Sequence, residues 1–288
     1  MASSSRIVFI DVDGTILEHG STVAASTVEA IRQARENGHR VILCTGRARG
    51  DIDPAVWAIG VDGAITNGGV TASIGDELVV SRLLPVETAA RLRSALETRG
   101  IHYFLQTDDE VFASAGMTAL VREYVRRVQA DDDARGVTRP EDSLAGLATR
   151  TYRDAAEAPA DAIAKAVFVS LDGDGLETLR SAIGDEFHIV PGSIPLPGGS
   201  NGEICLLGTN KGTAIELVLD HLGESADDVI GIGDSWNDVE MFEVCGTSVA
   251  MGNAEPELKA LADHVTTSID DDGVWNAFVH LGLVDAQD

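Results

Sequence analysis

Short apolar runs alternate with helix-like segments at the start of the chain, and this alternation limits the possible folds more than any other feature. Residues 6–10, 41–44 and 63–66 are rich in β-branched side chains, which predicts three buried strands. Residues 22–37 predict a helix, and Gly38 suits the left-handed residue that closes it. Strands that are joined through helices favour a parallel sheet with helices on both faces.

Residues 84–198 interrupt this alternation. They contain helix-like segments, strand-like runs and an acidic stretch, at 86–99, 118–129, 167–171, 187–190 and 130–141. The Pro- and Gly-rich passage 191–202 predicts a domain boundary. Beyond it the alternation returns, with helices expected at 211–222, 256–262 and 274–281 and strands at 229–232 and 248–251. We therefore expect one α/β domain, residues 1–83 and 199–288, interrupted by an inserted domain, residues 84–198.

The chain is strongly acidic. It has 21 Lys and Arg against 47 Asp and Glu, which gives a formal net charge of −26. A field of this sign repels nucleic acid and anionic membranes, so neither is expected as a partner. It also repels phosphorylated molecules, so a phosphate site in this chain needs a bound cation or a few well-placed Lys and Arg side chains.

The three cysteines, Cys44, Cys205 and Cys245, are too few and too scattered for a disulfide framework or a zinc site. Each lies in an apolar run, which predicts a small buried side chain. No apolar signal segment precedes the first strand, and no apolar stretch is long enough to cross a bilayer. We expect a soluble cytoplasmic protein, and the sequence fits a monomer and a homodimer equally.

The run Asp11-Val12-Asp13-Gly14-Thr15 follows directly on the first predicted strand. Alternate residues of an extended segment point the same way, so the carboxylates of Asp11 and Asp13 are able to converge on one small volume. Buried carboxylates are costly without a partner, and a bound cation removes that cost. Taken alone, the run is equally compatible with an ordinary strand-end turn capped by aspartates.

Residues 233–238 (Gly-Asp-Ser-Trp-Asn-Asp) repeat this arrangement after the strand at 229–232. A turn entering a helix is able to present both Asp234 and Asp238. Carboxylate oxygens are the hard ligands that Mg²⁺ prefers. Together with Asp11, these residues predict a cation site drawn from two distant parts of the chain; helix capping by Asp234 or Ser235 is the alternative.

Five motifs, in order and with the right intervals, resemble those of the haloacid dehalogenase superfamily, specifically its Cof-like phosphatases with a type-2 (C2B) cap. They are Asp11–Thr15, Thr45-Gly46-Arg47 with the turn at Asn67-Gly68, Lys211 in Asn210-Lys211-Gly212, Gly233–Asp238, and Met251-Gly252-Asn253-Ala254. The resemblance covers the whole chain. It implies a Rossmann-like parallel-sheet core domain with an inserted α+β cap domain that excludes water and contacts substrate.

The resemblance also implies roles for these residues. Asp11 would be the nucleophile that forms an aspartyl-phosphate, and Asp13 would act first as general acid and then as general base. Mg²⁺ would be bound by Asp11, Asp234 and the main-chain carbonyl of Asp13, with Asp238 nearby. The other phosphate oxygens would be held by Thr45, Gly46, Lys211 and Asn237. Arg47 and Asn67 would face substrate or cap, although a surface position fits Arg47 nearly as well.

Other acidic clusters carry weaker signals. The run Asp172-Gly173-Asp174-Gly175 imitates the first motif, but a turn before the helix at 176–183 explains it better than a metal site. The runs 131–133 and 270–272 are expected to be solvated loops. The alternative for the second run is a position lining the site, which the resemblance suggests because a family loop lies near it.

The leading functional prediction is a phosphomonoesterase that acts on a small phosphorylated metabolite such as a sugar phosphate. The first alternative is a phosphomutase of the same superfamily, resembling phosphomannomutase, which returns the phosphate to the same sugar. The second is a regulatory protein that binds a phosphometabolite without catalysis. The complete set of acidic residues and Lys211 argues against this second alternative, because binding alone does not need a general acid.

Overall fold

The computed structural model describes residues 5–18, 22–135, 150–191 and 199–285. The chain divides into two compact units, Met1–Ser81 with Asn210–Asp288, and Arg82–Thr209. These limits differ from the expected boundary at 198/199, because the strand β13 (Ser200–Leu206) pairs with strands of the second unit. The Pro- and Gly-rich signal therefore lies before the last strand of the inserted unit and not after it.

The first unit contains an eight-stranded sheet in the order β16-β15-β14-β1-β4-β5-β6-β7. The six strands from β16 to β5 run parallel, and their bounds are His264–Val265, Thr247–Ala250, Val229–Gly233, Ile7–Ile10, Arg40–Cys44 and Gly63–Thr66. The last two, Thr71–Ile74 and Glu77–Ser81, extend the sheet antiparallel. The expected α/β fold with a parallel-sheet core is confirmed, and the antiparallel extension is an addition to it.

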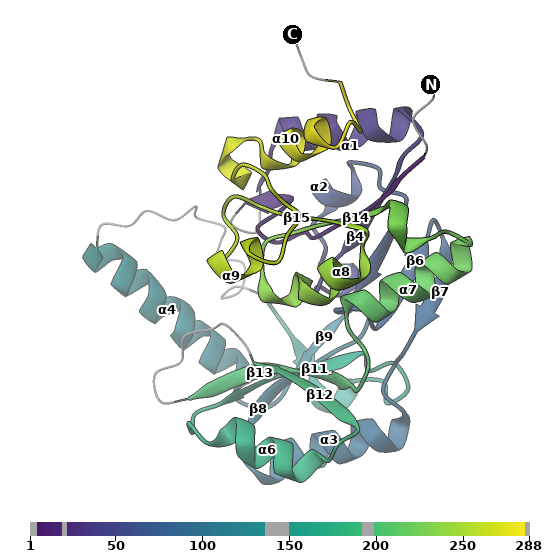
Figure 1. Ribbon diagram of the computed structural model, residues 1–288. Helices are drawn as coiled ribbons and strands as arrows, with labels where there is room; N and C mark the ends of the chain where they lie inside the picture. The colour runs from purple at the N-terminus through teal and green to yellow at the C-terminus, as the bar shows by residue number, and fades with distance from the viewer. Residues whose placement is uncertain (1–4, 19–21, 136–149, 192–198, 286–288) are drawn as a thin grey trace. The chain divides into compact units, whose positions relative to one another are not determined.

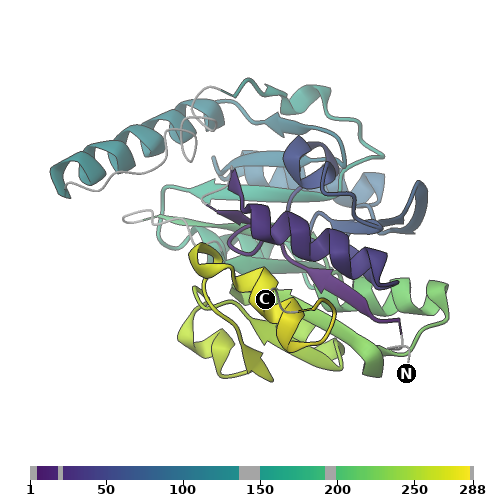
Figure 2. The ribbon, with the colours of Figure 1, turned by 90° about the horizontal axis from the view of Figure 1, so that it is seen from above.

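Helices cover both faces of this sheet (Figure 1). On one face α1 (Ala25–Glu36) lies beside α10 (Gly273–His280), as Figure 2 also shows, and they bury Ile31 and Phe278 against the strands. On the other face α7 (Lys211–Leu222) and α8 (Val239–Val244) bury Ile215 and Met241. Each strand between them is apolar on both sides, which is why the sequence shows continuous apolar runs here.

The helix expected at 22–37 begins later than its pattern indicated. Thr22–Val23 form β3, which pairs with β2 (Leu17–Glu18) in a two-stranded ribbon, so α1 starts at Ala25. The helix ends as expected, with Gly38 at φ +90°. The remaining short elements of this unit are η1 (Arg49–Asp51), α2 (Pro54–Trp57), η3 (Ala226–Asp228), η4 (Trp236–Asp238), α9 (Pro256–Lys259) and η5 (Ile269–Asp271).

The second unit contains a six-stranded sheet in the order β10-β9-β8-β11-β13-β12. The bounds are Arg153–Asp154, Val111–Ala113, His102–Gln106, Lys165–Ser170, Ser200–Leu206 and Phe187–Pro191. Helices α3 (Val86–Thr98) and α6 (Gly175–Ile183) pack on one face of it through Leu92 and Leu179. The turn η2 (Ala155–Glu157) follows β10. This mixture of helices and mainly antiparallel strands is the α+β insertion that the sequence predicts.

The helix α4 spans Met117–Arg135 and is longer than the predicted 118–129. The run 131–133, expected to be a loop, belongs to its last turns, where Asp132 is buried and its two neighbours are exposed. Residues 136–141 of the acidic stretch and 192–198 of the Pro- and Gly-rich passage lie outside the described residues. No helix in the described part of the chain is long and apolar enough to cross a membrane.

Candidate active site

Asp11 lies where β1 ends, at the carboxyl edge of the parallel sheet. Its main-chain amide donates a hydrogen bond of 2.9 Å to the carbonyl of Ile232 in the neighbouring strand β14. The side chain is 3 % exposed. Because β1 and β14 are parallel and paired in register, the residues that follow them lie at the same edge of the sheet.

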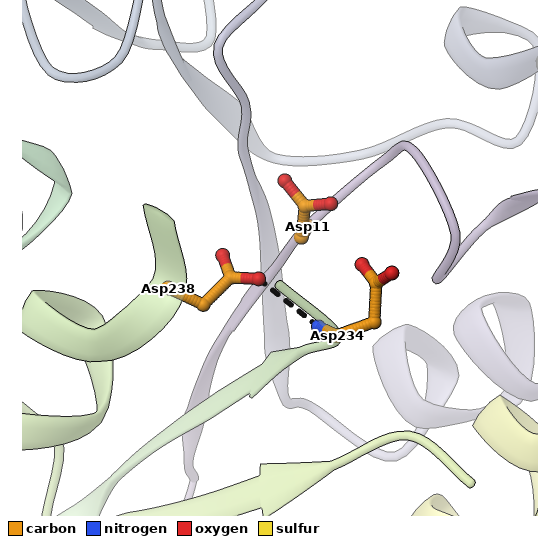
Figure 3. A group of neighbouring side chains, drawn as sticks. All are labelled: Asp11, Asp234 and Asp238. Atoms are coloured by element: carbon orange, nitrogen blue, oxygen red, sulfur yellow. Dashed lines mark hydrogen bonds between the residues drawn. The ribbon is translucent and has the colours of Figure 1, made fainter. Parts of the chain in front are cut away.

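Two further carboxylates, those of Asp234 and Asp238, follow β14 at this edge (Figure 3). The Oδ2 atom of Asp238 accepts hydrogen bonds from the main-chain amides of Asp234 and Ser235, at 3.0 and 3.1 Å. One oxygen from each of Asp11, Asp234 and Asp238 lies within 4.8 Å of the other two. The structure thus brings together the three side chains that the sequence places on two distant segments.

Lys211 is the first residue of α7, and its side chain reaches the same carboxylates. Asn210 caps the helix by accepting a hydrogen bond from the amide of Thr213, at 2.8 Å. The Lys211 ammonium donates to Asp11 Oδ1 at 2.6 Å and to Asp238 Oδ1 at 2.5 Å. Lys211 is 2 % exposed, so these are buried ion pairs.

Burial and charge act in opposite directions on this group. Burial raises the pKa of the Asp11 carboxyl, and the Lys211 ammonium opposes that rise. Burial alone would lower the pKa of Lys211, but the charges of Asp11 and Asp238 outweigh it, so the ammonium stays protonated. Burial and the charge of Asp238 raise the pKa of Asp234 to about 7. Three carboxylates therefore share one ammonium, and the group is short of positive charge.

This set of side chains fits a divalent cation. Its atoms are hard carboxylate oxygens, which suit Mg²⁺, and their charge exceeds that of the single lysine. Gly14 leaves the necessary room: a Cβ atom on it would lie 2.2 Å from Asp234 Oδ2. The positive φ of Gly14, +82°, also suits glycine. The residues present are therefore compatible with the expected metal.

Asp13 is not part of this carboxylate cluster. Its side chain is 50 % exposed and forms a two-pronged ion pair with Arg47. The Nε and Nη2 atoms of Arg47 donate to Asp13 Oδ2 and Oδ1, at 2.8 and 2.5 Å. The sequence predicted that Arg47 faces substrate, cap or solvent; the structure instead places it against the predicted general acid. The expected metal contact of the Asp13 main-chain carbonyl stays a prediction.

The remaining predicted residues lie after β4, β5 and β14. Thr45 is buried at the end of β4, and its hydroxyl accepts a hydrogen bond from the amide of Arg47, at 3.1 Å. Gly46 follows it. Asn67 is buried with φ +53°, and its main-chain amide donates a hydrogen bond to the main-chain carbonyl of Arg47, at 2.7 Å. Asn237 is exposed, and its Oδ1 accepts from the Lys211 ammonium, at 3.4 Å.

Two polar side chains complete the arrangement without having been assigned a role from the sequence. The hydroxyl of Thr15 donates to Asp234 Oδ1 at 3.3 Å, and the Nδ2 atom of Asn253 donates to the carbonyl of Gly14 at 2.8 Å. Both stand in motifs that the sequence singled out. Their contacts depend on how separate loops meet, which no periodicity reveals. They hold the 11–15 segment against the 234–238 segment and the loop after β15.

The discounted acidic runs contribute no ligand to this cluster. Asp172 and Asp174 form a turn before α6, as expected, but the Asp174 side chain at the N-cap accepts no capping hydrogen bond. The run 270–272 is exposed and lies around the turn η5. Within the described residues, Asp11, Asp234 and Asp238 form the one group of three potential ligands close enough to hold a metal ion.

Comparisons with known proteins find relatives that match most of the chain. The chain is 28 % identical over 276 residues to 5-amino-6-(5-phospho-D-ribitylamino)uracil phosphatase YwtE of Bacillus subtilis, covering 93 % of this chain and 95 % of the relative. It is 27 % identical over 274 residues to pyridoxal phosphate phosphatase YbhA of Escherichia coli, covering 92 % and 96 %. These relatives are matched over nearly their whole length and are phosphatases.

Solved structures give the same fold. A haloacid dehalogenase subclass IIB sugar phosphatase superposes with a TM-score of 0.76 at 22 % identity, covering 97 % of this chain and all of the other. The family model for haloacid dehalogenase-like hydrolases matches residues 8–278, which include each motif from Asp11 to Asn253. The chain therefore belongs to the haloacid dehalogenase-like hydrolase family, as its motifs predicted.

Proposed function

We propose that this enzyme is a magnesium-dependent phosphatase that hydrolyses a small phosphorylated metabolite through an aspartyl-phosphate on Asp11. The observation that carries the proposal is the buried Asp11 carboxylate, held by the Lys211 ammonium and lying within 4.8 Å of two further carboxylates. Phosphoryl transfer depends mainly on positioning and on stabilising negative charge. In a chain with a net charge of −26, Lys211 and the cation that these carboxylates would bind supply the positive charge locally.

The metal would be held by Asp11 and Asp234, with Asp238 and the Asp13 carbonyl adjoining. When bound, Mg²⁺ supplies positive charge that offsets the carboxylates and the phosphoryl group of the substrate. Lys211 adds a second positive charge beside Asp11. It also lies at the N-terminus of α7, where a helix favours anions by about 0.3–1 kcal/mol. Thr45, the Gly46 amide and Asn237 would hold the phosphate oxygens that are not transferred.

In the first half of the reaction, an Asp11 oxygen forms a bond to phosphorus while the bond from phosphorus to the substrate oxygen breaks. Asp13 gives its proton to that leaving oxygen, which departs as an alcohol. Asp11 is assigned as nucleophile because it is buried and held by Lys211, whereas Asp13 is half-exposed.

In the second half, water attacks phosphorus while the bond from phosphorus to Asp11 breaks. Asp13, now a carboxylate, takes the proton from the attacking water, and inorganic phosphate is released. Asp11 returns to its ionised form and Asp13 to its protonated form, so the cycle is closed. One residue thus serves as general acid and then as general base.

The substrate class rests on the relatives. One is named for a phosphorylated ribitylamino-uracil and another for pyridoxal phosphate, both of which are small phosphate monoesters. A neighbour of the same fold is a sugar phosphatase. We therefore expect a small phosphomonoester, with sugar and polyol phosphates as the first compounds to try.

A phosphate-release screen tests this proposal. The full chain is incubated with Mg²⁺ and a panel of sugar, polyol and heterocyclic phosphate monoesters, and free phosphate is measured. We expect release from at least one compound, which excess EDTA abolishes. Release that EDTA leaves unchanged would contradict the metal assignment. Conversion of a hexose 6-phosphate to its 1-phosphate without free phosphate would indicate a mutase and overturn the hydrolase proposal.

A further inference from the structure

We propose that Arg47 is a positioning residue that acts through Asp13, by holding its carboxylate in one orientation for proton transfer. This inference rests on the proposed function, because it concerns the residue to which that function gives the acid–base role. It assigns Arg47 a different task from the substrate or surface contact that its sequence motif suggested.

The ion pair between the two residues has the geometry of an oriented contact. Two separate nitrogens of the guanidinium donate to the two oxygens of Asp13, at 2.8 and 2.5 Å. A pair of parallel hydrogen bonds fixes the plane of the carboxylate as well as its position. Lysine, a point charge, would not fix that plane.

Arg47 is the more firmly held member of the pair. Its Nη1 atom donates to the carbonyl of Asp51 at 3.0 Å. Its main chain is held from two sides, by the Thr45 hydroxyl at 3.1 Å and the Asn67 amide at 2.7 Å. The Arg47 side chain is 26 % exposed, against 50 % for Asp13. Arg47 is therefore the rigidly held residue, and it fixes the orientation of the half-exposed Asp13 side chain.

The guanidinium remains a cation throughout this arrangement. The hydrogen bonds that Arg47 donates to Asp13 raise the pKa of Arg47 above its usual value, and the charges of Asp51 and Asp53 add to this. Arg47 is therefore not a proton donor itself. Its contribution lies in geometry, because a general acid must lie within hydrogen-bond reach of the oxygen that it protonates.

This account distinguishes leaving groups. An alkyl or sugar alcohol leaves poorly without a proton, whereas 4-nitrophenolate is a stable anion and leaves without one. Loss of Arg47 should therefore slow hydrolysis of a sugar phosphate by about 10- to 100-fold, which is part of the roughly 10²- to 10⁴-fold that general acid catalysis supplies. Hydrolysis of 4-nitrophenyl phosphate should change by less than about 3-fold in its phosphoryl-transfer rate.

The test compares single-turnover phosphoryl transfer in wild type, Arg47→Met, Asp13→Asn and the double variant. Single turnover isolates the first half-reaction, which is the half that needs the leaving-group proton. If Arg47 acts through Asp13, the double variant should be no slower than Asp13→Asn alone on the sugar phosphate. Arg35→Met is the matched control, because Arg35 forms a similar two-pronged pair with Asp62, at 3.0 and 2.7 Å.

Two results would overturn the inference. If Arg47 binds the phosphate directly, Arg47→Met would slow phosphoryl transfer from both substrates equally. The rate loss in the double variant would then be the product of the losses in Arg47→Met and Asp13→Asn. If the pair is only structural, Arg47→Met would lower the melting temperature as Arg35→Met does and would not discriminate between leaving groups. Phosphate release by wild type and by Asp11→Asn is measured first. If wild type releases no phosphate, or if Asp11→Asn releases it equally, the proposed function fails, and that failure is distinguished from a failure of the Arg47 inference.

Discussion

Lys211 Nζ lies 2.6 Å from Asp11 Oδ1, although 200 positions separate the two residues in the chain. The same ammonium contacts Asp238, so one lysine joins the ends of β1 and β14 and the start of α7. These contacts are buried, and removal of one partner from a buried ion pair leaves an uncompensated charge. Lys211 is therefore both a structural and a functional residue.

Lys211→Met should lower the unfolding free energy by about 3–5 kcal/mol in EDTA, because the buried carboxylates of Asp11 and Asp238 then lose their cation. Mg²⁺ should restore part of this stability by supplying charge to the same carboxylates, without restoring phosphatase activity. Urea unfolding with EDTA and with Mg²⁺ measures this. Lys259→Met is the control, because the Lys259 ammonium donates to the carbonyl of Gly252 and not to a carboxylate of the cluster. Wild-type stability of Lys211→Met in EDTA would contradict the assigned role.

Gly14→Ala should weaken Mg²⁺ binding and activity by at least about tenfold, which corresponds to a loss of about 1.4 kcal/mol. The reason is the predicted clash, since the new Cβ would meet Asp234 Oδ2 at 2.2 Å. Gly38→Ala separates this clash from backbone strain, because Gly38 also has a positive φ but nothing lies within 4 Å of its Cβ position. Both variants should lose about 1–2 kcal/mol through that strain. Equal phosphatase activity in Gly14→Ala and Gly38→Ala would show that the clash with Asp234 does not affect the site.

Mg²⁺ binding should depend on pH through Asp234, whose pKa burial raises to about 7. Below that pH the carboxyl holds a proton, which the cation must displace, so binding weakens as pH falls. Calorimetric titration at pH 8 and pH 6 should show a decrease of about tenfold in affinity. Asp263→Asn should leave this dependence unchanged, because Asp263 contacts Ser248 and not the cluster. Equal affinity at both pH values would argue against Asp234 as a ligand.

Added salt should stabilise the fold. The net charge of −26 causes self-repulsion, and the three lysines, Lys165, Lys211 and Lys259, are all buried or half-buried, so they do little to relieve it at the surface. Raising KCl from about 0.1 to 1 M shortens the screening length from about 10 to 3 Å. The melting temperature should rise by about 2–4 °C for each kcal/mol of repulsion that is removed. A fall in melting temperature over this range would contradict the account; an uncharged osmolyte controls for general solvent effects.

Much of the core fold was predictable because its signals are local. The continuous apolar runs before Asp11, Thr45 and Asp234 indicate strands that are buried on both faces. Parallel strands bring their carboxyl ends to one edge, so the sequence alone predicts that Asp11 and Asp234 lie together. The Cof-like motifs then supplied the roles.

The strand β13 was missed for a physical reason. Its apolar residues Ile204, Cys205 and Leu206 form only a short run, which follows closely on a Pro- and Gly-rich passage. That passage indicates a break in the chain, and so short a run does not by itself predict a strand. The pairing with β11 and β12 that makes this segment a strand is nonlocal, and composition does not reveal it.

The pair between Arg47 and Asp13 lay beyond sequence reasoning as well. An arginine after a strand has several partners within reach, and the contact with Asp13 depends on the loop conformations after β1 and β4. The anchoring carbonyl belongs to Asp51 in the turn η1, which the sequence did not predict. Such contacts follow from how three loops meet at one edge of the sheet.

The central claim is that Asp11 is the nucleophile, and phosphate release by Asp11→Asn in the presence of Mg²⁺ tests it most directly. The substitution keeps the size of the side chain and removes its negative charge, so the variant should fold. Its thermal melting is compared with that of wild type as a check. We predict that its phosphate release is indistinguishable from that of a blank on every substrate that wild type hydrolyses. Sustained multiple turnover by folded Asp11→Asn would contradict the aspartyl-phosphate mechanism.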